Sequence, residues 1–249
     1  MAHVSSKPAG PKGWSRRRDY AAWFDRPLGH AYRRSLEAVL EPWIAERKAR
    51  LALDAGCGPI LTFLDAFDPA TEIVAADCSL EMARSANERL EARGRRGAAL
   101  CASVERLPFP DGAFDFVLSI NCLEFVADPS RALAELHRVA APGARAVIGV
   151  LNRRGCWEWS RRLRRPWSSR TYYTGRFFTR GELVSGLHAA GWRVEQVRSS
   201  VRFPPVPLPR SSWYRGLERL VPDARAGVLV ACAVRDERAG RAPLATVPS

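Results

Sequence analysis

The chain has 249 residues, of which 47% are hydrophobic and 26% charged, a balance typical of a globular domain with a sizeable core. It contains no run of the roughly 18 to 20 apolar residues that a membrane-spanning helix needs, and no signal-peptide-like apolar stretch near residue 1. These features exclude a helical integral membrane protein and predict a single cytoplasmic domain.

The formal net charge of +13 is concentrated in one region, because residues 151–210 carry 13 Arg against three Glu. Such a surplus attracts a phosphate-bearing substrate, an RNA backbone or an anionic membrane surface. A second interpretation stays open. The chain has 36 Arg and only three Lys, a bias that GC-rich codon usage produces without any selected binding site.

The six cysteines are far apart and form no Cys-x-x-Cys pair. This spacing predicts reduced thiols, with neither a disulfide framework nor a metal site.

The chain begins with a stretch, 1–18, that is rich in Pro, Gly, Ser and Arg and is predicted to be disordered. We expect one folded domain over 19–235 and a flexible tail over 236–249. Within 27–47, the apolar residues Leu36, Leu40 and Trp43 recur at helical spacing. We therefore expect a helical cap over 19–49.

The next segment, 51–59, is the most informative in the chain. An apolar strand over 50–55 runs through Asp54 into the turn Gly56-Cys57-Gly58. The two glycines have no Cβ, so the backbone can bend sharply there and approach a ligand closely. A second strand, 72–77, ends in Asp77, at the spacing that places an acid against a ribose diol in an α/β unit. A dinucleotide-binding Gly-x-Gly-x-x-Gly pattern fails, because Leu61 stands at the third glycine position.

The rest of the chain continues the alternation of strands and helices. The elements predicted in order are a short helix after Pro59, a helix from Ser79, strands near 98–102 and 114–120, a helix with Asp128 as its cap that ends at Pro142-Gly143, a strand over 144–151, a helix opened by a Thr179–Glu182 capping box, and strands over 192–201 and 225–234.

This order implies a doubly wound, mostly parallel sheet with helices on both faces. Ligands of such sheets bind beyond the carboxyl ends of the strands, where the strand order reverses. We therefore expect Asp54, Asp77 and the residues that follow Ile120 to converge.

Several blocks of this sequence resemble the class I S-adenosylmethionine-dependent methyltransferases, particularly the small-molecule branch of ubiquinone and menaquinone biosynthesis. The blocks are 53–59, 74–79 followed by Met82, 107–115, Asp128-Pro129, Glu135 with Arg138-Val139, and Pro142-Gly143. The resemblance covers roughly residues 50–151 in order and spacing.

The resemblance implies a Rossmann-like sheet of seven strands with an antiparallel last strand. Beyond the matched blocks, the aromatic residues that alternate with arginines over 152–178 predict an inserted substrate-side cover. The resemblance also implies S-adenosylmethionine as the cofactor. The cofactor-binding residues expected on these grounds are Asp54, Gly56, Cys57, Gly58, Asp77, Cys78, Ser103, Val104, Ile120 and Asn121. The chain departs from the family at four positions, where Ile60 and Ala144 replace glycines, Ser103 replaces an adenine-binding Asp, and Phe125 replaces a His. Adenine is then expected to depend on the backbone at Val104 and on packing by Leu80 and Leu107.

Two residues are candidate general bases for a hydroxyl or amine acceptor. His30 lies beside the cap helix, and Glu124 follows the fourth strand, where an exposed loop carboxylate without a catalytic role is the alternative. On the substrate side we expect Tyr20, Trp23, Trp157, Tyr172 and Tyr173, which either wall an apolar or aromatic acceptor or pack the inserted segment against the sheet.

The leading functional hypothesis is an enzyme that methylates a small organic acceptor at O, N or C. Two alternatives remain open: an RNA methyltransferase that uses the Arg-rich region 152–210, and a non-catalytic cofactor-binding or peripheral membrane protein. An amino-directed DNA methyltransferase is not expected, because Ser119-Ile-Asn-Cys122 stands in place of an Asn/Asp-Pro-Pro-Tyr motif.

Overall fold

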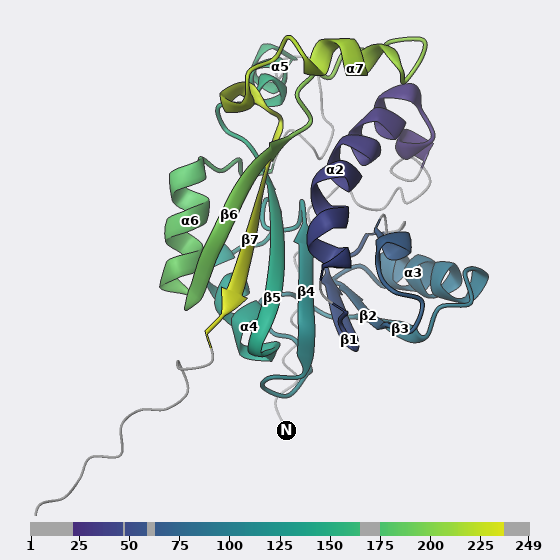
Figure 1. The fold of residues 1–249 in the computed structure, drawn as a ribbon, viewed down its shortest axis with the longest axis vertical. Coiled ribbons are helices and arrows are strands. Elements are labelled where there is room, and N and C mark those ends of the chain that lie inside the picture. Colours follow the sequence, from purple (N-terminus) through teal and green to yellow (C-terminus); the bar gives the residue numbers. More distant parts are fainter. Residues whose placement is uncertain (1–21, 47, 59–62, 165–174, 237–249) are drawn as a thin grey trace, which may run out of the picture.

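The computed structural model describes residues 22–46, 48–58, 63–164 and 175–236 (Figure 1). The predictions for the N-terminal stretch, the C-terminal tail, Ile60, Tyr20, Tyr172 and Tyr173 lie outside these residues. No helix within the described ranges is both long and apolar enough to cross a membrane.

The fold is built on one seven-stranded sheet in the order β3-β2-β1-β4-β5-β7-β6. The strands β1 to β5 pair in parallel, and β7 pairs antiparallel with both β5 and β6. The predicted mostly parallel sheet with an antiparallel last strand is thereby confirmed. The strands are β1 (Leu51–Ala55), β2 (Glu72–Asp77), β3 (Gly97–Cys101), β4 (Phe114–Ile120), β5 (Ala140–Leu151), β6 (Trp192–Ser200) and β7 (Val228–Arg235).

Helices connect and flank the strands, and the two clearest predicted caps are present. Asp128 caps one helix by accepting from the N–H groups of Ser130 and Arg131, and Thr179 and Glu182 form the reciprocal capping box of another. The helices are α2 (Pro27–Ala45), α3 (Leu80–Ala92), α4 (Pro129–Val139), α5 (Cys156–Arg164), α6 (Arg180–Ala189) and α7 (Trp213–Glu218), with short 3-10 turns η1 (Leu64–Ala66) and η4 (Asp223–Arg225).

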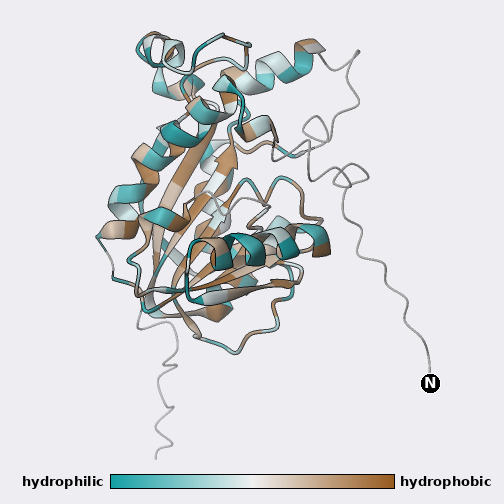
Figure 2. Cartoon of the chain, turned by 90° about the vertical axis from the view of Figure 1, so that its right-hand side faces the viewer, coloured by the Kyte–Doolittle hydropathy of each residue, from teal (hydrophilic) through white to brown (hydrophobic). Residues whose placement is uncertain are grey.

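Side chains that alternate along each strand separate the core into two layers. In β4, Phe116 and Leu118 pack on the face covered by α2 and α3, whereas Val117 packs on the face covered by α4 and α6. The strands are hydrophobic between helices whose outer surfaces are hydrophilic (Figure 2).

One predicted boundary is wrong. Pro142-Gly143 does not end the helix, because α4 stops at Val139 and β5 begins at once with Ala140. The Pro-Gly pair instead lies in a register shift of β5, between the pairs Phe114–Ala140 and Phe116–Arg145. An irregular strand accommodates a proline that cannot donate a ladder hydrogen bond and a glycine at φ 75°.

The strand order reverses between β1 and β4. From β1 the chain adds β2 and β3 on one side of the sheet, and it then crosses back to place β4 on the other side of β1. The carboxyl ends of β1, β2 and β4 therefore meet at the switch point, where ligands of doubly wound sheets bind.

Candidate active site

The turn after β1 depends on two glycines with left-handed backbone. Gly56 has φ 77° and Gly58 has φ 59°, and the N–H of Gly56 donates to the carbonyl of Ala76 at 2.7 Å. A Cβ added to Gly56 would lie 2.4 Å from Sγ of Cys122. The turn is therefore packed directly against the chain that leaves β4, and no side chain fits at its first glycine.

Asp77 holds this turn against the start of α3. Its Oδ2 accepts from the N–H of Gly58 at 3.1 Å, and its Oδ1 accepts from the N–H of Ser79 at 2.9 Å. Burial raises the pKa of this carboxyl, while the two N–H groups lower it. Each carboxylate oxygen has room in its coordination for a second donor, so the group is able to accept ligand hydroxyls without releasing the turn.

Asp54 is a second carboxyl at the same end of the sheet, on β1 beside β2. Burial, and secondarily the charge of Asp77, raise its pKa to about 7. Among the residues that the structure describes, no cationic side chain contributes to the pKa shift of either aspartate. Two neighbouring carboxyls without a cation between them favour a positively charged ligand.

The chain that leaves β4 contributes Asn121, which adopts φ 54°, a left-handed conformation that Asn tolerates better than most residues. Its Nδ2 donates to the hydroxyl of Tyr32 on α2 at 2.6 Å. Its Oδ1 is buried and accepts no hydrogen bond from the described residues. This contact ties the cap helix α2 to the carboxyl end of β4.

Glu124 is buried, with 3% of its surface exposed, so the alternative of an exposed loop carboxylate is wrong. Its Oε1 accepts from the N–H of Leu151 at 2.5 Å, while its Oε2 is buried and has no hydrogen-bond partner among the described residues. Burial raises the pKa of Glu124 to about 8. The carboxyl caps the last N–H of β5 and keeps its proton to a higher pH than an ordinary glutamate does.

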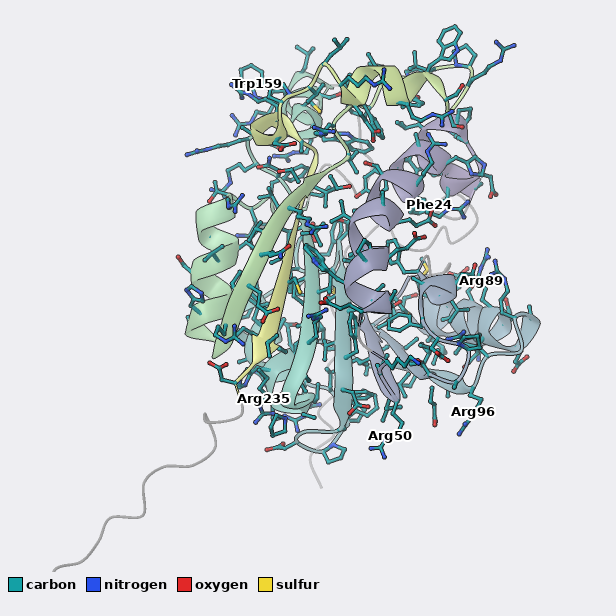
Figure 3. The ribbon with its side chains drawn as sticks, viewed as in Figure 1. Phe24, Arg50, Arg89, Arg96, Trp159 and Arg235 are labelled. Atoms are coloured by element: carbon teal, nitrogen blue, oxygen red, sulfur yellow. The ribbon has the colours of Figure 1, made fainter. Side chains whose placement is uncertain are left out.

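An aromatic cluster brings the N-terminal segment and the cover together. Tyr32 lies 5.5 Å from Trp23 and 5.2 Å from Trp157 between ring centroids. Trp157 is buried, and its indole N–H donates to the carbonyl of Phe203 at 2.7 Å. Phe24 lies beside α2 in the same cluster (Figure 3). For Trp157 these contacts support the packing interpretation.

The remaining expected cofactor residues lie around β2, β3 and β4. Ser103 forms a local turn in which its hydroxyl accepts from the N–H of Glu105 at 3.3 Å. Val104 is buried, whereas Cys78 is exposed. Cys57 is buried, and Ile120 ends β4.

His30 lies on the exposed surface of α2, where its Nδ1 is 3.4 Å from the guanidinium of Arg33. Glu124, in contrast, lies at the carboxyl ends of β4 and β5. The structure does not bring the two base candidates together by any contact among the described residues.

Two site residues were not predicted from the sequence. Tyr32 lies four residues before Leu36 on the buried stripe of α2, so the helical spacing contained the signal. Cys122 packs behind Gly56, a contact between distant segments that no local pattern indicates.

Known proteins support this architecture. A family model described as a methyltransferase domain matches residues 53–148. A demethylmenaquinone methyltransferase of Thermus thermophilus is 40% identical over 116 residues, which cover 47% of this chain and 51% of that protein. A malonyl-[acyl-carrier protein] O-methyltransferase of Pseudescherichia vulneris is 34% identical over 43% of this chain and 41% of its own length. The chain thus spans about half the length of the relatives it matches.

Solved structures agree on the fold. A S-adenosylmethionine-dependent methyltransferase from Thermotoga maritima superposes with a TM-score of 0.66 at 21% identity, over 90% of this chain and 98% of the other. The sequence match, the sheet order and the glycine turn between two acidic strand ends agree with one another. The chain is therefore similar to methyltransferase domains over residues 53–148, and it has the fold of an S-adenosylmethionine-dependent methyltransferase.

Proposed function

We propose that this protein transfers a methyl group from S-adenosylmethionine to a small organic acceptor. The observation that carries the proposal is the meeting of Asp54, Asp77 and the glycine turn at the switch point of the sheet. The same end of the sheet carries two buried acceptor atoms, Asn121 Oδ1 and Glu124 Oε2, without partners among the described residues.

The residues present fit the cofactor. S-adenosylmethionine carries a sulfonium and an ammonium charge, and the two aspartates offer carboxyls that no described cation neutralises. In this proposal Asp77 accepts the ribose hydroxyls, and the left-handed glycines Gly56 and Gly58 let the backbone approach the ligand. Leu80, 53% exposed at the start of α3, and the buried Val104 offer apolar surface for adenine. The cofactor, when bound, supplies the methyl group.

We propose that Glu124 takes the proton of the acceptor. A carboxyl with a pKa of about 8 is a suitable proton acceptor near neutral pH, because its two protonation states are close in free energy. The bond from the N–H of Leu151 fixes Oε1, so Oε2 is the atom that receives the proton. We favour Glu124 over His30, which lies in solvent on α2.

Aromatic residues of the N-terminal segment and of α2, together with the relatives, support the proposed acceptor class. Trp23, Phe24 and Tyr32 form an aromatic group beside Asn121 and favour an apolar or aromatic acceptor. The two named relatives act on a menaquinone precursor and on a malonyl group carried by a protein. We propose that the enzyme works in the cytoplasm, where its six free thiols remain reduced.

The test combines binding and turnover. Calorimetry should show binding of S-adenosylmethionine and S-adenosylhomocysteine to the full chain. Incubation with isotope-labelled S-adenosylmethionine and a metabolite extract, followed by mass spectrometry, should then reveal one labelled methylated product. Cofactor binding without a labelled product in any extract would favour the non-catalytic alternative, and absence of cofactor binding would refute the proposal.

A further inference from the structure

Two helices at the carboxyl end of the sheet expose large apolar side chains. Trp159 and Leu163 on α5 are 65% and 76% exposed, and Trp213 and Leu220 on or just after α7 are 51% and 76% exposed. We call these four residues, with the arginines of 210–225, the α5–α7 face. They are four of the five large hydrophobic side chains exposed among the described residues.

The chain topology puts both helices at one end of the molecule. The segment with α5 follows the end of β5, and the segment with α7 joins the end of β6 to the start of the antiparallel β7. All three of these strand ends lie at the carboxyl edge of the parallel strands. Figure 1 shows α5 and α7 together at the top of the molecule, and Trp159 points outward there in Figure 3.

Direct contacts join the two segments into one surface. The guanidinium of Arg225 lies 5.8 Å from the ring of Trp159 and donates to the carbonyl of Arg154 at 3.4 Å. The indole N–H of Trp157 and the thiol of Cys156 both donate to the carbonyl of Phe203. The face is thus supported by the core beneath it.

The spacing on each helix gathers the apolar groups. Trp159 and Leu163 are four residues apart, so they lie next to each other on α5. Trp213 and Leu220 are seven residues apart, and Tyr214 between them is fully buried. The inner side of each segment packs on the core through Trp157 or Tyr214, and the outer side exposes a Trp and a Leu to solvent.

Positive charge predominates in the two segments that carry these apolar groups. Within 153–164 and 202–225 the sequence has ten arginines and three acidic residues. Glu158 and Asp223 are paired with arginines, whereas Arg210, Arg215 and Arg219 form no ion pair with another described residue. The face therefore combines unpaired cations with exposed aliphatic and indole groups.

We propose that the α5–α7 face docks the enzyme on an anionic lipid membrane. Arginines next to a membrane are attracted to anionic headgroups, Trp is enriched at membrane interfaces, and Leu gains by entering the acyl boundary. An RNA backbone would use the arginines but would gain nothing from two Leu side chains that are 76% exposed. The proposal extends beyond the transferase reaction, because it concerns a surface outside the glycine turn and the two aspartates.

Docking by this face would present the carboxyl edge of the sheet, and with it the candidate site, to the lipid surface. An apolar acceptor dissolved in the bilayer would then enter the site without crossing water.

Vesicle sedimentation with the full chain tests the charge component. We expect binding to vesicles of equimolar phosphatidylglycerol and phosphatidylcholine, and little to phosphatidylcholine alone. Arg215→Gln/Arg219→Gln should bind roughly 30-fold more weakly, as two lost cations near a surface imply. Arg50→Gln/Arg89→Gln, the same charge change at exposed arginines elsewhere (Figure 3), should bind as the unchanged protein does. An equal loss in both pairs would overturn a specific face.

A second pair of variants distinguishes a lipid surface from RNA and from a second copy of the chain as the partner of the α5–α7 face. Leu163→Ser/Leu220→Ser should lower vesicle binding about tenfold, while Leu163→Met/Leu220→Met should retain it. Because both side chains are largely exposed, neither pair should change the melting temperature. Unchanged vesicle binding in the Ser pair would overturn the proposal. Binding to single-stranded RNA but not to vesicles would do the same, as would a dimer that the Ser pair dissociates in the absence of vesicle binding.

Discussion

Replacement of Asp77 by asparagine tests the cofactor assignment most directly. The carboxylate holds two backbone N–H groups, of Gly58 at 3.1 Å and of Ser79 at 2.9 Å, and is proposed to accept ribose hydroxyls as well. An amide has one acceptor oxygen and one donor nitrogen. In the Asp77→Asn variant the oxygen can still accept one backbone N–H, while the nitrogen faces the other N–H as a second donor and cannot accept from it.

The expected loss follows from the hydrogen bonds removed. A hydrogen bond to a charged group contributes about 1.5 to 3 kcal/mol, so losing one ribose bond weakens binding about 10- to 100-fold. Part of the change also falls on stability, because one backbone N–H loses its acceptor. The two effects must therefore be separated.

Asp115 provides the matched control. Its Oδ2 accepts from the N–H groups of Arg50 at 3.0 Å and Leu51 at 3.1 Å, at the amino end of β1, away from the proposed site. Calorimetric titration with S-adenosylhomocysteine should show weaker binding for Asp77→Asn and unchanged binding for Asp115→Asn. Equal affinities for Asp77→Asn and the unchanged protein would refute the ribose contact and the reasoning built on it.

Three further predictions concern the same site. The affinity for S-adenosylmethionine should rise up to about tenfold per pH unit toward pH 7, because the Asp54 carboxyl, with a pKa of about 7, must ionise to attract the cation; titration of Asp54→Asn should give a flat profile. Gly56→Ala should lower the unfolding free energy by at least about 2 kcal/mol, because φ is 77° and the new Cβ meets Cys122 at 2.4 Å. In the control Gly181→Ala on α6 the new Cβ meets nothing within 4 Å, so the melting temperature should stay the same or rise slightly, because Ala favours a helix more than Gly does. Glu124 has a folded-state pKa of about 8 against 4.5 as the ordinary value, so the folded protein binds the extra proton and its stability should fall as the pH rises from about 5 to about 8. Glu124→Gln should remove that part of the slope in thermal melts, and an unaltered slope would show that Glu124 ionises normally; with an acceptor in hand, kcat should fall by about 10² to 10⁴.

Local patterns in the sequence predicted most of the fold. The strand that runs through Asp54, the helix that starts at Ser79, the capping box at Thr179 and the Asp128 cap before Pro129 all appear as expected, because each rests on interactions within a few residues. The boundary at Pro142-Gly143 was wrong because pairing with β4 extends β5 through a bulge that overrides the local turn signal.

The site was predicted less fully, because its contacts join segments far apart in the chain. Glu124 follows a strand at a predicted loop, so the sequence left it open as a solvated carboxylate, yet the structure buries it and bonds it to the N–H of Leu151. The bond between Asn121 and Tyr32 spans 89 residues, and only the tertiary arrangement of α2 across the sheet brings the pair together.

The position of β7 bears on how the nascent chain folds. This strand is the last of the seven along the chain, yet in the sheet it lies between β5 and β6. It is the only neighbour of β6 in the described sheet. During synthesis β5 therefore remains an open edge, rich in Val and Ile, while roughly 80 further residues leave the ribosome. Before β7 is synthesised, β6 has no strand with which to pair, so the sheet is completed late. We expect chaperones to contact the exposed β5 edge at that stage.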